Sequence, residues 1–108
     1  MALVASQDNG DGVVRFATGR YLTDATAAAI VIICGFRPRY VRVLNNTSAD
    51  KYEWSKGMAD ASAFKQVAAG TSSAITTLGI TPSGSGFTIG LDTDVNVINE
   101  QLSWIAFG

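Results

Sequence analysis

The chain has 108 residues, enough for one domain with a single core, and its formal net charge of −1 comes with basic residues that are scattered along the sequence. This distribution argues against nucleic acid as a partner, and the lack of histidine excludes Ser-His-Asp and Cys-His catalytic groups as well as the common zinc sites. Apolar residues make up 47% and charged residues only 16%, so we expect a partner to cover some apolar surface.

Neither a membrane span nor a secretory signal is expected from the sequence. The longest apolar run, Ala27 to Cys34, is far shorter than the roughly 20 residues that cross a bilayer. The first residues lack a basic region followed by a long apolar one. The only cysteine, Cys34, excludes a disulfide within the chain, and its apolar surroundings predict a buried, inert thiol.

Residues 1–12 are predicted to form an N-terminal arm, and residues 13–108 a single β-sandwich domain. The arm ends in the polar cluster Asp8 to Gly12, whose composition favours a turn or a flexible chain. Ordering such a segment alone costs roughly 1–2 kcal/mol of backbone entropy per residue, so we expect it to become ordered mainly against a neighbour. Leu3 and Val4 are its apolar anchors and the candidate interface residues.

The first part of the domain is predicted to contain short strands. Val13 to Ala17 is followed by a break at Thr18-Gly19, after which Arg20 to Thr23 could pair back. Asp24 could cap a helix through the alanines that follow it, but the β-branched residues at 30–33 favour a strand. We therefore predict a buried strand at Ala29 to Cys34, with a hairpin-like return into the next strand.

Residues 39–56 are predicted to form the hairpin around which the other strands are built. Side chains alternate in polarity on both sides of a polar turn that runs from Asn45 to Asp50. The turn is longer than two residues, so its length does not fix the register. Val41, Val43 and Asn45 share one face of the first strand, and Tyr52 and Trp54 share one face of the second.

The rest of the chain adds short strands separated by turns. Residues 57–63 predict one helical turn or a loop, and residues 79–86 predict a loop. The last strand, Gln101 to Phe107, is apolar on both faces, so we place it centrally in a sheet or against a partner. Further strands are expected at Phe64 to Ala68, Ala74 to Leu78 and Phe87 to Ile89. This pattern predicts an all-β fold, a single antiparallel β-sandwich or jelly-roll-like domain.

Three large aromatic residues are expected in the core: Trp54, Phe87 and Trp104. Each occupies the apolar phase of an alternating strand, and complete burial of such a side chain stabilises the fold by on the order of 2–3 kcal/mol. The alternative is that Trp54 or Trp104 faces solvent and serves in recognition.

Asp92 and Asp94 are the residues that most resemble a chemical site. They could form a carboxylate pair, or the start of a calcium loop with oxygen ligands at alternate positions. A calcium loop needs Gly where this chain has Val97, and Glu where it has Ser103. We therefore expect both aspartates to cap backbone amides locally, and we predict no catalytic residue, no metal site and no cofactor.

Several runs resemble a family of small virion structural proteins of tailed bacteriophages. The resemblance covers roughly residues 30–108 and is one of composition and order, without a catalytic signature. It rests on Gly35 to Asn45, Tyr52 to Trp54 with Gly57-Met58, Lys65 to Thr71, Gly86 to Gly90 and Leu102 to Phe107.

This resemblance implies a head decoration (cement) protein or a piece of the tail and its fibres, with no enzymatic residue to carry over. We expect a decoration protein that is made in the host cytoplasm and stabilises the head shell at the capsid surface of the virion. Its partners would be the major capsid protein and itself, as a homotrimer at local three-fold positions. A tail or tail-fibre domain that binds a host receptor or glycan is the alternative. A small enzyme is the third possibility, which the composition disfavours.

Overall fold

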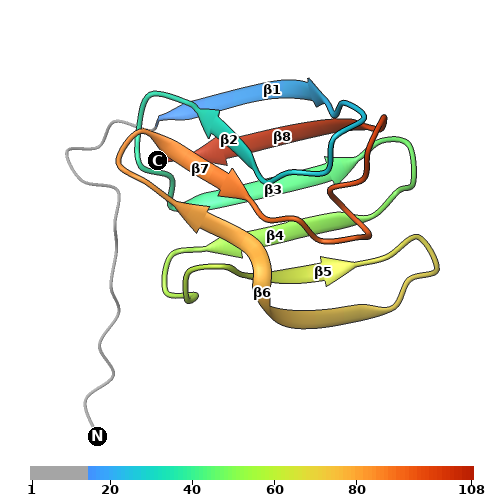
Figure 1. The fold of residues 1–108 in the computed structure, drawn as a ribbon. Coiled ribbons are helices and arrows are strands. Elements are labelled where there is room, and N and C mark those ends of the chain that lie inside the picture. Colours follow the sequence, from blue (N-terminus) through green and yellow to red (C-terminus); the bar gives the residue numbers. More distant parts are fainter. Residues whose placement is uncertain (1–14) are drawn as a thin grey trace, which may run out of the picture.

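The computed structural model describes residues 15–108, and the predicted arm with Leu3 and Val4 lies outside this range. The described part is all-β (Figure 1). Its strands are β1 (Phe16–Leu22), β2 (Ile30–Ile33), β3 (Tyr40–Asn45), β4 (Lys51–Ser55), β5 (Ser62–Gln66), β6 (Ser72–Pro82), β7 (Gly86–Ile89) and β8 (Gln101–Phe107).

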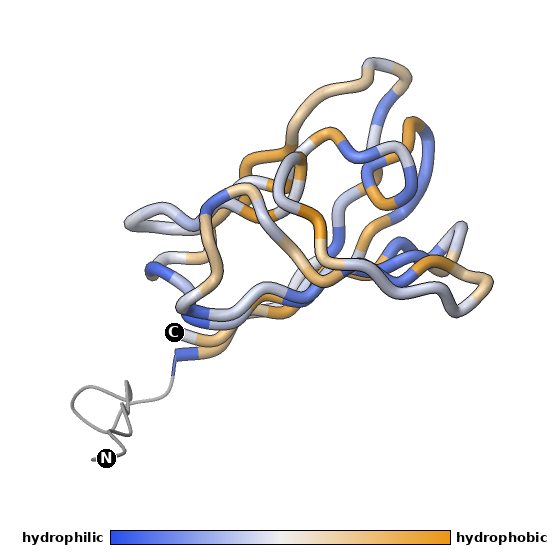
Figure 2. The backbone as a smooth tube through the Cα atoms, turned by 90° about the horizontal axis from the view of Figure 1, so that it is seen from below, coloured by the Kyte–Doolittle hydropathy of each residue, from blue (hydrophilic) through white to orange (hydrophobic). Residues whose placement is uncertain are grey.

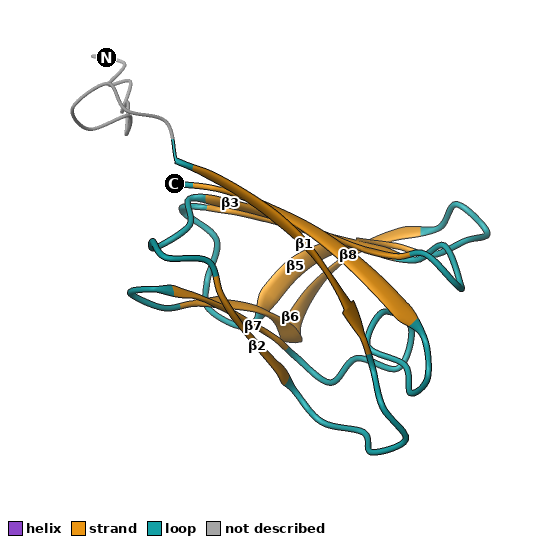
Figure 3. Cartoon of the chain, turned by 90° about the horizontal axis from the view of Figure 1, so that it is seen from above, coloured by secondary structure: helices purple, strands orange, loops and turns teal. Residues whose placement is uncertain are grey.

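All eight strands belong to one antiparallel sheet in the order β1-β8-β3-β4-β5-β6-β7-β2, which curls into a half-barrel. Seen from above, β1, β8, β3 and β5 lie in one layer, and β7 and β2 lie in the layer that faces it (Figure 3). The prediction of an all-β antiparallel domain is confirmed. The two layers are parts of a single continuous sheet, whose free edges are β1 and β2.

Strand β6 joins the layers because it bends in the middle. Its first half pairs with β5 through Ile75, its second half pairs with β7, and the register shifts between Ser62 and Ala63 of β5. At the bend Leu78 has a φ of 62°, which is unusual for a residue with a side chain. Gly79 follows it, where a Cβ would lie 2.4 Å from the carbonyl O of Ser62. The strand predicted at Ala74 to Leu78 is therefore part of a longer strand, with a glycine where two backbones approach closely.

The predicted central hairpin is confirmed as β3 and β4. Val41 is paired with Trp54 and Val43 with Tyr52, and β3 pairs on its other side with β8. Strand β8 is thus enclosed by β1 and β3, as its apolar residues on both faces predicted.

The core lies between the two layers, where hydrophobic stretches of the chain face each other (Figure 2). Trp54 is 4% exposed and Phe87 is fully buried. Trp104 is only partly buried at the margin of the core, where its ring meets Phe87 in an edge-to-face contact with 5.5 Å between centroids. The fully buried side chains of largest volume are those of Tyr52, Phe87, Ile80, Ile89, Leu102, Val41, Val43, Val95 and Asn45.

The prediction that the strand is interrupted at Thr18-Gly19 is wrong. Strand β1 continues through both residues, and all of it pairs with β8, with Gly19 opposite Trp104. Arg20 to Thr23 therefore does not pair back on the preceding residues. A glycine can stay within a strand here because a large side chain of the neighbouring strand covers it.

The prediction of a buried strand at Ala29 to Cys34 is correct for only one face. Ile30 and Ile32 are buried, whereas Val31 and Ile33 are 65% and 68% exposed. Strand β2 pairs with β7 alone, so it is an edge strand with one face outside the core. The residues after it do not form a hairpin, because they cross from one layer of the sheet to the other to begin β3.

Candidate functional site

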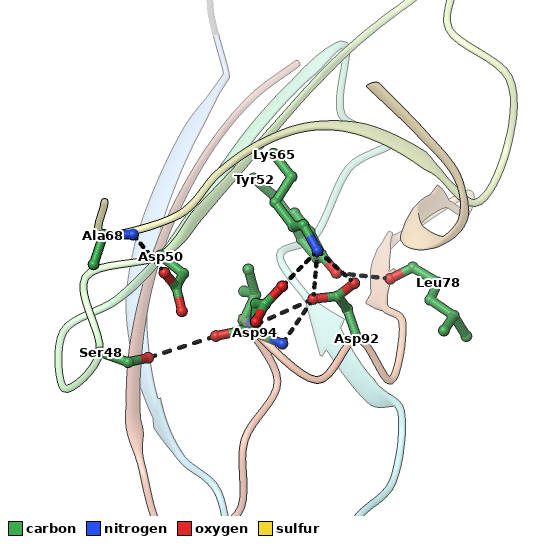
Figure 4. Close-up of polar contacts among 9 residues, drawn as sticks. Ser48, Asp50, Tyr52, Lys65, Ala68, Leu78, Asp92 and Asp94 are labelled. Atoms are coloured by element: carbon green, nitrogen blue, oxygen red, sulfur yellow. Dashed lines mark hydrogen bonds and ion pairs between the residues drawn. The ribbon is translucent and has the colours of Figure 1, made fainter. Parts of the chain in front are cut away.

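Lys65 forms the most prominent charged cluster, together with Asp92 and Asp94 (Figure 4). Its Nζ lies 3.1 Å from an oxygen of Asp92 and 2.7 Å from one of Asp94. Lys65 is directly opposite Tyr52 across β4 and β5, so both side chains point to the concave face of the sheet. The ammonium therefore connects the middle of the sheet to the loop between β7 and β8.

Asp92 also organises that loop. Its Oδ1 accepts hydrogen bonds from the backbone N–H of Asp94 at 2.8 Å and of Val95 at 3.4 Å. Its side chain is 11% exposed, compared with 45% for Asp94. The local backbone capping expected for both aspartates is thus confirmed for Asp92, whereas the side chain of Asp94 accepts from Lys65 instead.

The cluster does not have the composition of a cation site. The ammonium of Lys65 is already placed between the two carboxylates, where it would repel a bound cation. Within residues 15–108, no group of three or more His, Cys, Asp or Glu side chains could hold a metal ion.

Burial raises the pKa of the Tyr52 hydroxyl far above its usual value of 10.0, and the negative charge of Asp92 adds to the shift. The hydroxyl donates a hydrogen bond to the carbonyl O of Leu78 at 3.0 Å. The hydrogen bond to Asp94 is the main reason why the pKa of Lys65 is above 10.5, although partial burial acts in the opposite direction. Both groups keep their protons at neutral pH, so neither has the properties of a general base.

A second polar network surrounds Asn45 at the end of β3. Its side-chain amide donates to the carbonyl O of Val95 and to Oε1 of Glu100, both at 2.9 Å. Its Oδ1 accepts from the backbone N–H of Thr47 at 2.9 Å and of Ser48 at 3.0 Å. All the hydrogen-bonding capacity of this fully buried amide is thus used to attach the β7–β8 loop to the β3–β4 turn.

Both networks hold the same loop, residues 90–100, against the sheet. No buried side-chain nitrogen or oxygen in the described residues lacks a hydrogen-bond partner. The buried groups of both networks are satisfied by partners within the chain, and this arrangement attaches the loop to the sheet and stabilises the fold.

The other candidate sites are apolar surfaces at the two edges of the sheet. At the β1 edge, Phe16 is 54% and Leu22 is 71% exposed, and at the β2 edge the exposed pair is Val31 and Ile33. Contiguous exposed apolar side chains mark interaction surfaces more often than isolated ones do, and Val31 and Ile33 form such a pair, whereas Phe16 and Leu22 lie at opposite ends of β1. The remaining exposed large hydrophobic residues are Tyr21, Phe64, Leu78, Leu91 and Ile98.

An aromatic row crosses the convex face of the sheet beside the β1 edge. Phe107 lies between Phe16, with 5.2 Å between ring centroids, and Tyr40, with 6.0 Å. The three residues are aligned because Phe107 is paired with both Phe16 and Tyr40. Next to the row lies a shallow depression, lined in part by Ile105 and Arg42. Aromatic and arginine side chains are the types enriched in protein interfaces.

The two tryptophans considered for recognition differ in position. Trp54 is buried, and its indole N–H donates to the carbonyl O of Ala59 at 3.2 Å, so it is not available to a ligand. Trp104 is partly exposed, but its ring packs on the core.

Cys34 is only partly buried, contrary to the expected burial, and its thiol donates to the carbonyl O of Phe36 at 3.3 Å. Leu3 and Val4 lie outside the described residues.

Comparison with models of known protein families, with curated proteins and with solved structures finds no match to this chain. Residues 15–108 contain no helix long and apolar enough to cross a membrane.

Proposed function

We propose that the protein is a virion structural protein of a tailed bacteriophage, and that it binds the head shell as a decoration (cement) subunit. Support comes from the resemblance of residues 30–108 to such proteins and from the apolar edges of the sheet. The interior polar groups serve the fold, which leaves the surface of the domain to carry the function.

The observation that carries the proposal is the exposure of apolar side chains on both free edges of the sheet. Leu22 at one edge and Ile33 at the other are about 70% exposed. An uncovered edge strand also presents unpaired backbone N–H and C=O groups, and it therefore favours addition of a strand from another chain. Such edges suit a subunit that is buried in an assembly.

Assembly on a capsid calls for two kinds of contact. One joins copies of the subunit, and we propose a trimer because a closed ring buries equivalent apolar surfaces at every contact. The other binds the major capsid protein, and the aromatic row of Phe16, Phe107 and Tyr40 supplies a surface of the right composition for it.

Immunogold labelling of intact phage particles with an antibody against this chain tests the proposed location. Gold over the head surface is the expected result. Gold confined to the tail or fibres would replace the decoration role with the tail role, and particles without label would overturn the virion proposal altogether.

Self-association is tested separately by sedimentation velocity on the full chain. A concentration-dependent shift from monomer to a defined oligomer at micromolar concentration is expected. A monomer up to about 100 μM would contradict the assembly role, because contacts of that weakness contribute less than roughly 6 kcal/mol.

A further inference from the structure

Strand β2 is the edge of the sheet that is least protected against the addition of another strand. Its sequence, Ile30 to Ile33, contains no charged residue and no proline, which are two of the usual means of blocking an edge. Two of its four side chains, Val31 and Ile33, are largely exposed on the outer face. The strand has four residues, so a partner segment of four residues can pair along its whole length.

The hydrogen-bonding pattern shows which backbone groups of β2 face outward. The N–H of Cys34 donates to the carbonyl O of Ser85, at the end of the ladder between β2 and β7. Hydrogen-bonded positions alternate in an antiparallel ladder, so Ile30 and Ile32 bond to β7. The N–H and C=O groups of Val31 and Ile33 therefore point away from the sheet.

A segment of matching length and chemistry lies in the same chain. Residues 2–5, Ala-Leu-Val-Ala, are uncharged and apolar, with Leu3 and Val4 as their large side chains. They precede a polar cluster that contains Gly10 and Gly12. A four-residue apolar strand can form backbone hydrogen bonds with Val31 and Ile33 of β2. Its side chains would then extend both faces of the sheet by one row.

A neighbouring copy is the acceptor that fits the proposed assembly role. Arg15 exchanges backbone hydrogen bonds with Gly108, at 3.3 and 2.9 Å, so the chain enters β1 in line with the β1–β8 ladder. Nine residues, 6–14, separate the apolar segment from Arg15 and span about 30 Å when extended. Strand β2 is the other free edge of the sheet, and a second copy presents the same edge to this segment.

We propose that residues 2–5 of one subunit add as a ninth strand to the β2 edge of a neighbouring subunit. Each copy then provides one donor segment and one acceptor edge, which permits a closed ring or a reciprocal pair. The inference rests on the proposed assembly role and identifies the contact that joins the subunits.

Three variants of the full chain test this contact by sedimentation velocity. The donor variant carries Leu3→Asp and Val4→Asp, the acceptor variant carries Val31→Lys and Ile33→Lys, and Phe64→Lys is the control at an exposed apolar position away from both edges. Donor and acceptor variants should each raise the dissociation constant at least tenfold, and the control should leave it unchanged. All three should melt as cooperatively as the original chain.

Mixing the donor and acceptor variants gives the decisive measurement. In the mixture the acceptor variant supplies an intact N-terminal segment and the donor variant supplies an intact β2 edge. Native mass spectrometry should therefore show a heterodimer, although each variant alone is monomeric. If both variants dissociate but the mixture stays monomeric, strand addition from the N-terminal segment is wrong. If the acceptor variant still assembles, the contact lies elsewhere while the assembly role stands. A full chain that is itself monomeric overturns both.

Discussion

Gly19 and Trp104 are direct partners across β1 and β8, and the indole ring covers the glycine so closely that a Cβ there would lie 2.7 Å from ring carbons. The indole ring also packs against Phe87, with 5.5 Å between the ring centroids and 77° between the ring planes. Gly19 thus provides the space in which Trp104 can pack at the margin of the core.

We predict that Gly19→Ala lowers the free energy of unfolding by about 1–3 kcal/mol, as overpacking does elsewhere. The added methyl group would displace the indole from Gly19 and disturb its contact with Phe87. Urea unfolding followed by tryptophan fluorescence measures both effects. Gly84→Ala is the control, since a Cβ at Gly84 meets nothing within 4 Å. Equal unfolding energies for the two variants would show that the indole adapts freely.

Alternation within the strands was enough to predict much of the fold. It predicted the β3–β4 hairpin and the burial of Trp54 and Phe87, because a one-residue slip would place every apolar side chain in solvent. It also gave the internal position of β8. It did not give the bend of β6 at Leu78, or the pairing of β2 with β7, because both depend on contacts between residues distant in sequence.

The polar networks were only partly accessible from the sequence. Asp92 carries a local signal, since an aspartate followed by turn residues commonly caps their backbone amides. Lys65 carries none: it points toward the core, while its neighbour Phe64 is 47% exposed, the reverse of the usual preference. Only the fold brings the loop with Asp92 and Asp94 over β5, where the ammonium can be paired.

Lys65→Met should lower the free energy of unfolding by about 1.5–3 kcal/mol, the range for hydrogen bonds to charged groups. The change leaves Asp92, which is nearly buried, without its cationic partner. Lys51→Met is the matched control, because the pair between Lys51 and Glu53 is 3.5 Å long and its side chains are 27% and 38% exposed. The control should change stability by less than about 1 kcal/mol. Chemical denaturation at pH 7 compares the two, and similar losses would contradict the structural role of Lys65.

Stability should fall as the pH rises above about 10, because Tyr52 and Lys65 have a higher pKa in the folded protein than in the unfolded chain. Unfolded chains release these protons near their usual pKa values of 10.0 and 10.5, while the folded protein still retains them. Their contribution is complete below pH 10 and is lost as the pH rises toward the folded values. Burial raises the pKa of Tyr40 as well, in the same direction.

Tyr52→Phe separates the part of this alkaline loss that belongs to Tyr52. At pH 7 the variant should lose about 1 kcal/mol with the hydrogen bond to Leu78. Between about pH 8 and pH 11 its unfolding free energy, measured in urea, should decline less steeply than that of the original chain. Parallel curves for the two proteins would show that Tyr52 ionises equally in both states.

Asn45→Asp should be among the most destabilising of the substitutions in the described domain that keep the size and shape of the side chain. The new carboxylate keeps the acceptor role toward the backbone of Thr47 and Ser48, but it cannot donate to Val95 and it faces the carboxylate of Glu100 across a contact of 2.9 Å. A like charge in a buried position together with two lost donors should cost about 3 kcal/mol or more at pH 7. Asn46→Asp, at an exposed neighbouring position, should change stability by less than about 0.5 kcal/mol.

The double variant Asn45→Asp with Glu100→Gln distinguishes charge repulsion from a change of shape. The glutamine removes the second negative charge and can donate its amide to the new carboxylate, so part of the lost stability should return. A favourable coupling of about 1 kcal/mol or more, from a double-mutant cycle in urea at pH 7, is expected for groups in direct contact. Additive losses would mean that Asn45 and Glu100 contribute to stability independently.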